Sequence, residues 1–338
     1  MYLRVRADKK KSASSLAIQL QTTLRKQNFK GTVLVIKNNK KYLSYSKGLA
    51  NQASNKANGA DTTYLINSVQ KTMTATMLMQ AVEVHKVSLT DKLSQFYPHV
   101  PGSSKITLRQ MLQMASGLVY TGDGFGTPKY KNDAAGIKYD LSKIKFDQKS
   151  YGRRTYQPIN YVLLTGIVEK VNHESYEKLF IKTFVKPLKL KETAFIWSKD
   201  KSLAKARLAK SYSEKNKPVE LNMNELHGEF GTGSIIMSNS DLYKCLKAML
   251  DGTLLSETAR NSLFQGSDNN VQGGNYGGGF YNFPTYHAAS GAGYGYTNFV
   301  CVSNDGKNAI IIQTNSPVKD YFKLRNDMHG LIEALQGE

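Results

Sequence analysis

Long hydrophobic runs are absent from this 338-residue sequence. Its most apolar stretches, such as GTVLVI and AIIIQTN, are far shorter than the ~18 apolar residues that a membrane-spanning helix needs. The basic start, MYLRVRADKKKSASS, lacks the apolar region of a signal peptide. This indicates either an intracellular protein or an exported one whose export segment is not in this sequence. We predict no transmembrane segment, a basic tail over residues 1–12 and one domain over 13–338.

Cysteine is also scarce, with two residues in the whole chain. Cys245 lies at helical spacing from Leu242 and Leu246, and Cys301 lies inside the strand-like segment NFVCVS. Both patterns are typical of small core residues. We therefore expect two free thiols rather than a disulfide.

Acidic residues are few relative to basic ones, 26 against 46, which gives a formal net charge of +20. The sequence has no helix-turn-helix, zinc-finger spacing or aromatic RNA-binding strand, so we expect no nucleic-acid partner. A diffuse positive field favours other polyanions, such as cell-wall teichoic acids or anionic membrane surfaces. A solvated basic surface without a partner is the alternative.

Two common hydrolase motifs are missing. Neither Gly-x-Ser-x-Gly nor His-Glu-x-x-His occurs, and the six histidines show no metal-ligand spacing. We therefore predict neither a metal site nor a cofactor.

The order of helical and strand-like patterns predicts a discontinuous sheet. A helix over 15–26 precedes two strand candidates, GTVLVIKNN and KKYLSYSKG, and helical periodicity dominates from 69 to 258. Strand patterns return after 272, and a helix over 318–335 follows them. We predict an α/β (α+β) fold whose antiparallel sheet comes from about 13–66 and 271–338, with a mainly helical insertion over about 67–270.

One glycine-rich segment, GSDNNVQGGNYGGGFYN, invites comparison with a phosphate-binding loop. Such a loop needs a strand before it and a helix after it. Here a strand pattern follows, so the segment indicates a pliable edge strand beside a cleft.

The segment INSVQKTMTATMLMQAVE places Ser68 and Lys71 three residues apart at the start of a helix. Residues at this spacing share a face, so the hydroxyl and the amine lie within hydrogen-bonding reach. A serine hydroxyl attacks at neutral pH when a neighbouring base takes its proton. The helix N-terminus also offers N–H groups to a developing oxyanion. The alternative is a helix-capping serine with a surface lysine.

Longer segments around these residues carry family motifs. LINSVQKTMTATMLMQAVEVHKVSLTDKLSQFYP and ITLRQMLQMASGL are followed by YQPINYVLLTGIVEKVNHESYEKLFIKTFVKPLKLKETAF, GEFGTGSIIMSNSDLYKCLKAML and YHAASGAGYGYTNFV. Together they resemble the serine β-lactamase and penicillin-binding-protein superfamily, especially its class C-like and esterase-like branch. The resemblance runs from about residue 31 to 335, and it implies that family's transpeptidase-like fold.

The resemblance also implies roles for the site residues. Ser68 would be the acylated nucleophile, Lys71 its base partner and Tyr156 a proton relay to the leaving group and the deacylating water. His287 would orient Tyr156 or bind a substrate carboxylate. The backbone N–H of Ser290 would complete an oxyanion hole with that of Ser68.

The chain departs from the family pattern at three positions. Gln157 and Pro158 follow Tyr156 where the family has Ser and Asn, and Ala289 takes the place of a motif glycine. Proline offers neither a side-chain amide nor a backbone N–H to a substrate. These changes disfavour β-lactam turnover and standard peptide recognition.

The resulting hypothesis is a serine hydrolase that forms an acyl-enzyme on Ser68. Its expected substrates are D-alanyl amides or esters of the bacterial cell wall, which implies an extracellular or cell-surface location. The alternatives are a small-ester hydrolase, a β-lactamase, or a catalytically silent relative that binds wall polymer.

Overall fold

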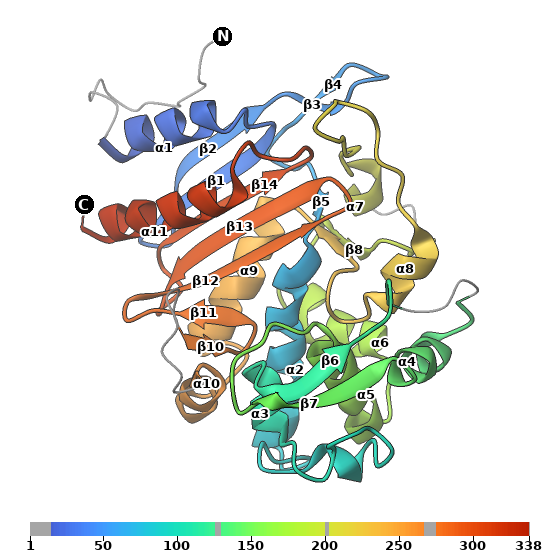
Figure 1. The fold of residues 1–338 in the computed structure, drawn as a ribbon. Coiled ribbons are helices and arrows are strands. Elements are labelled where there is room, and N and C mark those ends of the chain that lie inside the picture. Colours follow the sequence, from blue (N-terminus) through green and yellow to red (C-terminus); the bar gives the residue numbers. More distant parts are fainter. Residues whose placement is uncertain (1–14, 126–129, 200–202, 267–274, 338) are drawn as a thin grey trace.

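The computed structural model describes residues 15–125, 130–199, 203–266 and 275–337; the predicted basic tail over 1–12 lies outside them. Its main feature is a seven-stranded antiparallel sheet (Figure 1). In spatial order the strands are β10 (Asn275–Gly277), β11 (Phe280–Asn282), β12 (Tyr286–Gly293), β13 (Tyr296–Ser303), β14 (Ala309–Thr314), β1 (Gly31–Lys37) and β2 (Lys40–Lys47). Because β1 pairs with β14, the two ends of the chain close one sheet, as predicted.

Strand β1 is buried on both faces, which explains its continuous apolar run. Successive side chains of a strand point to opposite faces. Val33 and Val35 pack under the two terminal helices, α1 (Ser15–Lys26) and α11 (Tyr321–Gly337). Leu34 and Ile36 belong to the large core on the other face. Figure 1 shows α1 and α11 side by side over the first face.

The large core lies between the sheet and the helices of the middle of the chain. These helices are η1 (Asn67–Gln70), α2 (Lys71–Glu83), η2 (Leu93–Gln95), α3 (Leu108–Leu112), α4 (Asp133–Leu141), α5 (Ile159–Asn172), α6 (Tyr176–Phe180), η3 (Ile181–Val185), α7 (Leu203–Ala206), α8 (Met223–Gly228), α9 (Asn239–Leu250) and α10 (Glu257–Leu263). Helix α2 runs through the centre of this core and packs against α5. From Thr62 to Met79 every residue is buried except Ser68. The chain therefore exposes its candidate nucleophile from an otherwise buried segment.

Three small sheets join the helices, and the sequence patterns predicted none of them. They are β3 (Leu49–Asn51) with β4 (Lys56–Ala57), β5 (Tyr64–Leu65) with β9 (Ile235–Met237) and β8 (Thr193–Phe195), and β6 (Ser116–Tyr120) with β7 (Ile144–Tyr151). The segment LTDKLSQFY, predicted as helical, forms only the short η2.

The predicted fold class is confirmed: an antiparallel sheet is flanked by helices, with a mainly helical region between its two halves. The division of the domain at residues 66/67 and 270/271 stays a prediction. Cys245 in α9 and Cys301 in β13 are both buried and free, as expected of core residues. Within the described ranges, no helix has the length and apolar character needed to cross a bilayer.

Candidate active site

Ser68 and Lys71 meet as the helical spacing predicts. The Lys71 Nζ donates to the Ser68 Oγ at 2.9 Å and to the carbonyl oxygen of Thr232 at 3.4 Å. Lys71 is completely buried, whereas Ser68 is partly open to solvent. No ion pair between described residues involves Lys71, so its amine has the serine hydroxyl as its main polar partner. This contact positions the amine to take the proton of an attacking hydroxyl.

The turn before Ser68 fixes the direction of the hydroxyl. Asn67 has a φ of 48°, a left-handed conformation that asparagine tolerates better than most residues. The Asn67 side chain donates to the carbonyl of Leu65 at 3.3 Å, and the Gln70 side chain accepts from the N–H of Ser234 at 2.6 Å. These bonds hold η1 on both sides. Ser68 lies in its first turn, where N–H groups lack an intrahelical acceptor.

Tyr156 lies across from Lys71, in the segment just before α5. The Lys71 Nζ is 5.4 Å from the centre of the Tyr156 ring, which packs edge-on against the ring of Tyr276. Among the described residues, Tyr156 is one of the few large hydrophobic side chains that stay exposed, at 42%. A phenol held this way has one face on the amine and its edge open to a substrate.

These residues open into a cavity of about 230 Å³, which we call the nucleophile pocket. Its lining comprises Ser68, Tyr156, Tyr276, Gly279, Tyr281, Ser290, Gly291, Ala292, Tyr321 and Arg325. Gly279 brings the glycine-rich β10–β11 turn to the start of α2, because a Cβ there would lie 2.5 Å from the Thr72 nitrogen. The interpretation of this segment as an edge strand beside a cleft is confirmed for its described part, from residue 275 on.

Strand β12 presents its main chain to Ser68. The turn after it, Tyr294–Gly295, has positive φ at both residues (50° and 77°), as in a type I′ hairpin. In such a hairpin the flanking pair, Gly293 with Tyr296, is hydrogen-bonded, and bonded pairs then alternate along the ladder. The N–H groups of Ser290 and Ala292 therefore point away from β13, toward η1.

Gly291 makes the closest approach between β12 and the nucleophile. A Cβ on Gly291 would lie 2.8 Å from the Ser68 nitrogen and 2.4 Å from the Ile66 carbonyl oxygen. This corrects the predicted position of the motif's small residue, which is Gly291 rather than Ala289. Ala289 is buried in the large core and does not line the pocket. The motif's small residue thus lies two positions further along β12 than predicted. This makes the N–H of Ala292 a second candidate oxyanion donor, beside that of Ser290.

His287 is not in the pocket, and this corrects both roles expected for it. Its ring packs against Phe264 and Phe280, and its Nδ1 lies 2.6 Å from the Asn282 Oδ1. Burial lowers the pKa of His287 to about 4, so the ring is neutral at pH 7 and offers a substrate carboxylate no charge. Its position indicates a packing role.

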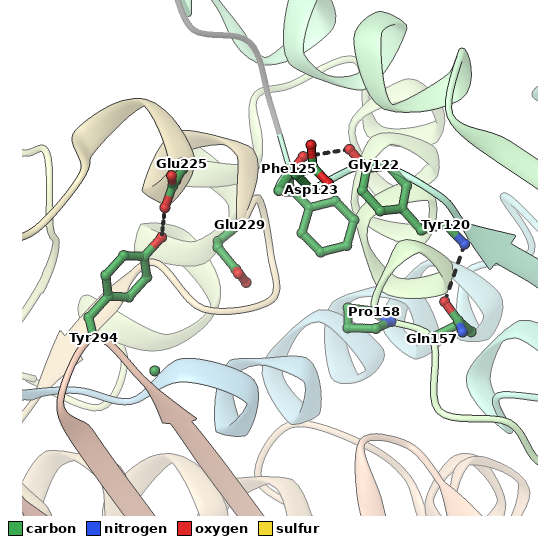
Figure 2. Close-up of a pocket in the computed structure, with 11 residues that line it drawn as sticks. Tyr120, Gly122, Asp123, Phe125, Gln157, Pro158, Glu225, Glu229 and Tyr294 are labelled. Carbon is green, nitrogen blue, oxygen red and sulfur yellow. Dashed lines mark hydrogen bonds between the residues drawn. The ribbon is translucent and has the colours of Figure 1, made fainter. Parts of the chain in front are cut away.

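Gln157 and Pro158 lie beside a second cavity, of about 470 Å³, which we call the acidic pocket (Figure 2). Its lining comprises Tyr120, Gly122, Asp123, Gly124, Phe125, Gln157, Pro158, Glu225, Glu229, Gly293 and Tyr294. The Gln157 side chain accepts from the N–H of Tyr120 at 3.3 Å, so it braces β6. This pocket adjoins the nucleophile pocket at the chain neighbours Tyr156 and Gln157, and again at Ala292 and Gly293.

Glu229 connects the acidic pocket with the Ser68–Lys71 pair. In Figure 2 its carboxylate extends into the space between Tyr294 and Pro158. Its Oε2 accepts from the Thr232 hydroxyl at 2.9 Å, and the Thr232 carbonyl accepts from Lys71. Thr232 thus links Glu229 to the Lys71 amine. Glu229 lies in the family segment GEFGTGSIIMSNSDLYKCLKAML, but no motif there assigns it a role.

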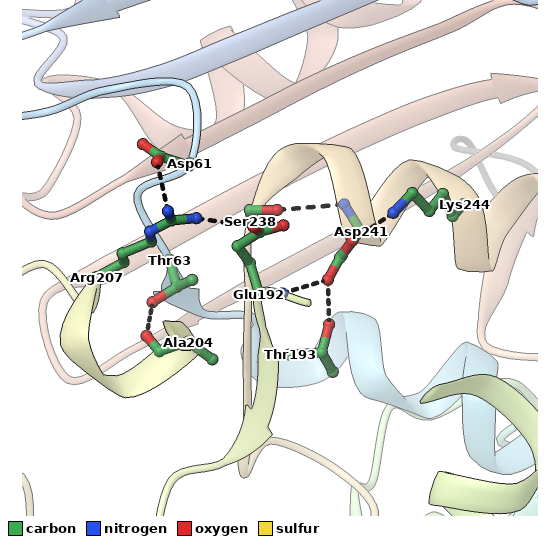
Figure 3. A network of polar contacts seen from close by, with 9 residues as sticks. All are labelled: Asp61, Thr63, Glu192, Thr193, Ala204, Arg207, Ser238, Asp241 and Lys244. Atoms are coloured by element: carbon green, nitrogen blue, oxygen red, sulfur yellow. Dashed lines mark hydrogen bonds and ion pairs between the residues drawn. The ribbon is translucent and has the colours of Figure 1, made fainter. Parts of the chain in front are cut away.

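A second polar cluster lies away from these pockets (Figure 3). Arg207 pairs with Asp61 at 3.2 Å and with Glu192 at 2.7 Å. The buried Asp241 accepts from Lys244 at 2.9 Å and from the N–H of Glu192 at 2.7 Å. Because these charges are paired with one another, the cluster has a structural role. Among the described residues, no group of three or more His, Cys, Asp or Glu side chains could hold a metal ion.

A serine hydrogen-bonded to a buried lysine, with a tyrosine beside the amine, is in this fold the arrangement of a serine hydrolase. The Beta-lactamase family profile matches residues 18–332, and the chain belongs to that family. The expected family and the expected enzyme class, a serine hydrolase, are confirmed.

Individual relatives extend this comparison. The chain is 30% identical to the teichoic acid D-alanine hydrolase of Staphylococcus aureus over 308 residues, 90% of this chain and 75% of that protein. It is 28% identical over 318 residues to the putative penicillin-binding protein PbpX of Bacillus subtilis, 91% of this chain and 78% of that protein. The crystal structure of FmtA from Staphylococcus aureus superimposes with a TM-score of 0.80 at 25% identity, covering 97% of this chain and 90% of that one.

Proposed function

We propose that this protein removes D-alanyl groups from esters of a cell-wall polymer through a Ser68 acyl-enzyme. The observation that carries the proposal is the 2.9 Å contact between the buried Lys71 amine and the Ser68 hydroxyl at the floor of an open pocket. Such a polymer substrate implies an extracellular or cell-surface location.

The proposed reaction has two steps. Lys71 accepts the Ser68 proton as Oγ attacks the ester carbonyl, and Ser68 and Ser290 or Ala292 donate N–H bonds to the oxyanion. Tyr156 delivers a proton to the leaving alkoxide as its bond to the carbonyl carbon breaks. Water then attacks the acyl carbon and gives a proton to the Tyr156 phenolate. As the bond from that carbon to Ser68 Oγ breaks, Lys71 returns its proton to Oγ, and D-alanine leaves.

The acidic pocket supports an ester of free D-alanine over a stem peptide. A D-alanyl ester keeps its α-amino group as an ammonium, whereas in a stem peptide the corresponding nitrogen is acylated and neutral. Glu229 lines the acidic pocket and is linked to Lys71 through Thr232, and its carboxylate suits an ammonium. The relative named as a teichoic acid D-alanine hydrolase supports the same choice.

Ser68→Ala tests the nucleophile. We expect ester hydrolysis to fall to the uncatalysed rate, because the variant has no group to acylate. The melting temperature should hardly change, since the Ser68 side chain caps no helix. Labelling of the wild type with a fluorophosphonate, followed by mass spectrometry, should place the adduct on Ser68. Absence of any adduct would favour the alternative, a silent polymer-binding protein.

Glu229→Gln tests whether the protein recognises the ammonium group of the D-alanyl ester. The amide keeps an acceptor for the Thr232 hydroxyl but removes the charge. We expect kcat/KM for a D-alanyl ester to fall about 10-fold, the loss of one charge-assisted contact, while the N-acetyl-D-alanyl ester changes less than about 2-fold. Equal losses on both esters would contradict recognition of the ammonium.

A further inference from the structure

Two arginines converge on one tyrosine at the other end of the nucleophile pocket. The Cζ of Arg154 lies 5.5 Å from the centre of the Tyr281 ring, and that of Arg325, from α11, lies 6.0 Å from the same centre. Both side chains are partly buried. Together with Tyr286, Ser290 and Phe299 they line a cavity of about 560 Å³, which we call the arginine pocket.

Within the part of the chain that the structure describes, this pair of like charges has no ion-pair partner. Glu333 also lines the cavity, without coming within ion-pair distance of either guanidinium. Two guanidinium groups at one partly buried ring repel each other, and an anion between them would offset that repulsion.

The three pockets follow one another along β12. Tyr286 and Ala288 line the arginine pocket, Ser290 lines both that pocket and the nucleophile pocket, and Gly293 belongs to the acidic pocket. Arg325 and Tyr281 are also shared by the first two. The cleft is therefore basic at one end and acidic at the other, with Ser68 between.

We propose that the arginine pocket binds a phosphate of the leaving group, so that the substrate is an aminoacyl ester of a polyol phosphate. This inference rests on the proposed function. The donor's ammonium then lies at Glu229, its ester carbonyl at Ser68, and its phosphate between Arg154 and Arg325. Planar guanidinium groups bind phosphate in a bidentate manner, which suits this arrangement.

The dimensions agree with such a donor. From Ser290 to Gly293 a strand advances about 10 Å. In an aminoacyl ester of a glycerol phosphate, about seven bonds separate the ammonium nitrogen from the phosphorus, roughly 8 Å when extended. The ester is thus slightly shorter than this stretch of strand. The Glu229 and arginine side chains can reach toward Ser68 from the two ends and make up the difference in length.

The test compares three D-alanyl esters that share the acyl group. The first is the ester of a glycerol phosphodiester, the second is the neutral glycerol ester, and the third is D-alanyl-D-lactate, whose leaving group carries a carboxylate. We expect wild-type kcat/KM to be at least about 10-fold higher for the phosphodiester than for the neutral ester. A ratio near one, or an equal preference for the lactate ester, overturns the assignment of a phosphate site.

Substitutions test whether Arg154 and Arg325 cause the preference for the phosphodiester. In Arg154→Gln with Arg325→Gln, the ratio of the two kcat/KM values should fall to within about 2-fold of one. Lys323→Gln removes one positive charge from the exposed side of α11, where Lys323 pairs with Asp327, and should leave the ratio unchanged. A preference that survives in the double variant, or that Lys323→Gln also abolishes, refutes the arginine pocket.

A binding measurement separates this inference from the proposed function. Ser68→Ala is titrated with unesterified polyglycerol phosphate, with and without the two arginine substitutions. Weaker binding, by about 10-fold, in the variant without the arginines supports the phosphate site even if no ester is hydrolysed. Equal binding overturns it. Failure of Ser68-dependent hydrolysis of all three esters would refute the proposed function alone.

Discussion

Gly291→Ala is the sharpest test of how β12 meets the nucleophile. The added methyl would lie 2.4 Å from the Ile66 carbonyl oxygen and 2.8 Å from the Ser68 nitrogen. A carbon and an oxygen settle near 3.5 Å, so the strand or η1 has to move by about 1 Å. Both contacts are main-chain atoms, and no flexible side chain can yield instead.

A shift of that size separates Ser68 from the N–H groups of Ser290 and Ala292. Misplacement by about 1 Å costs roughly 10²-fold in rate, and loss of one oxyanion donor costs about 10²–10³-fold. We therefore expect kcat for a D-alanyl ester to fall by about 10²–10³-fold.

The assay is steady-state hydrolysis together with thermal melting. Gly330→Ala is the matched control, because a Cβ there meets nothing within 4 Å. It should keep full activity and gain about 0.5–1 kcal/mol in stability from the better helix former. If Gly291→Ala is folded and fully active, β12 does not supply the oxyanion contact and the proposed register is wrong.

Three further predictions concern α5 and the turn before it. Tyr156→Phe should slow turnover by about 10²–10⁴-fold with little change in binding, because it removes only the proton-transferring hydroxyl. Unchanged rate constants for acylation and deacylation in pre-steady-state assays would exclude that role. Pro158→Asn should raise penicillin acylation relative to ester turnover, since Pro158 has φ −54°, which asparagine can adopt, and the amide restores a donor and an acceptor; an unchanged ratio of rate constants in a variant with normal melting would contradict this. Burial raises the pKa of Glu169 to about 7 from 4.5, so the folded protein keeps a proton that the unfolded chain releases, and stability falls as the pH rises from about 4.5 to 7. Glu169→Gln should therefore raise the melting temperature more at pH 8 than at pH 5, and an equal shift at both values would disprove the linkage.

The parts of the site that sequence patterns predicted are those fixed by local geometry. Ser68 and Lys71 are three residues apart on one helical segment, so any helix there brings them together. The strands GTVLVI and NFVCVS were predictable because their burial on both faces demands apolar residues throughout. Strands β6 and β7 were not, because they pair residues as distant as Ser116 and Tyr151, and no periodic pattern specifies such a pairing.

The register of β12 shows a different limit. Ala289 and Gly291 point to the same face of the strand, because side chains alternate with a period of two. A shift by two residues therefore preserves every hydrophobic match and leaves no trace in the pattern. What fixes the register is the two-residue turn at Tyr294–Gly295, whose backbone geometry is visible only in the structure.

Net charge and local charge act differently in this protein. A charge of +20 attracts any polyanion, but fields beyond about 8–10 Å are screened at physiological ionic strength, so the overall charge alone cannot orient a polymer. Orientation requires charges within one screening length of the nucleophile. Glu229 on one side of Ser68 and Arg325 on the other meet that requirement, because both belong to cavities at or beside the nucleophile pocket. A chain that reversed its direction would place an ammonium at the arginines and a phosphate at the carboxylate, and both contacts would be repulsive. In the proposed function, the two ends of the cleft therefore determine which way an aminoacyl ester enters, and the basic surface raises the concentration of polymer around it.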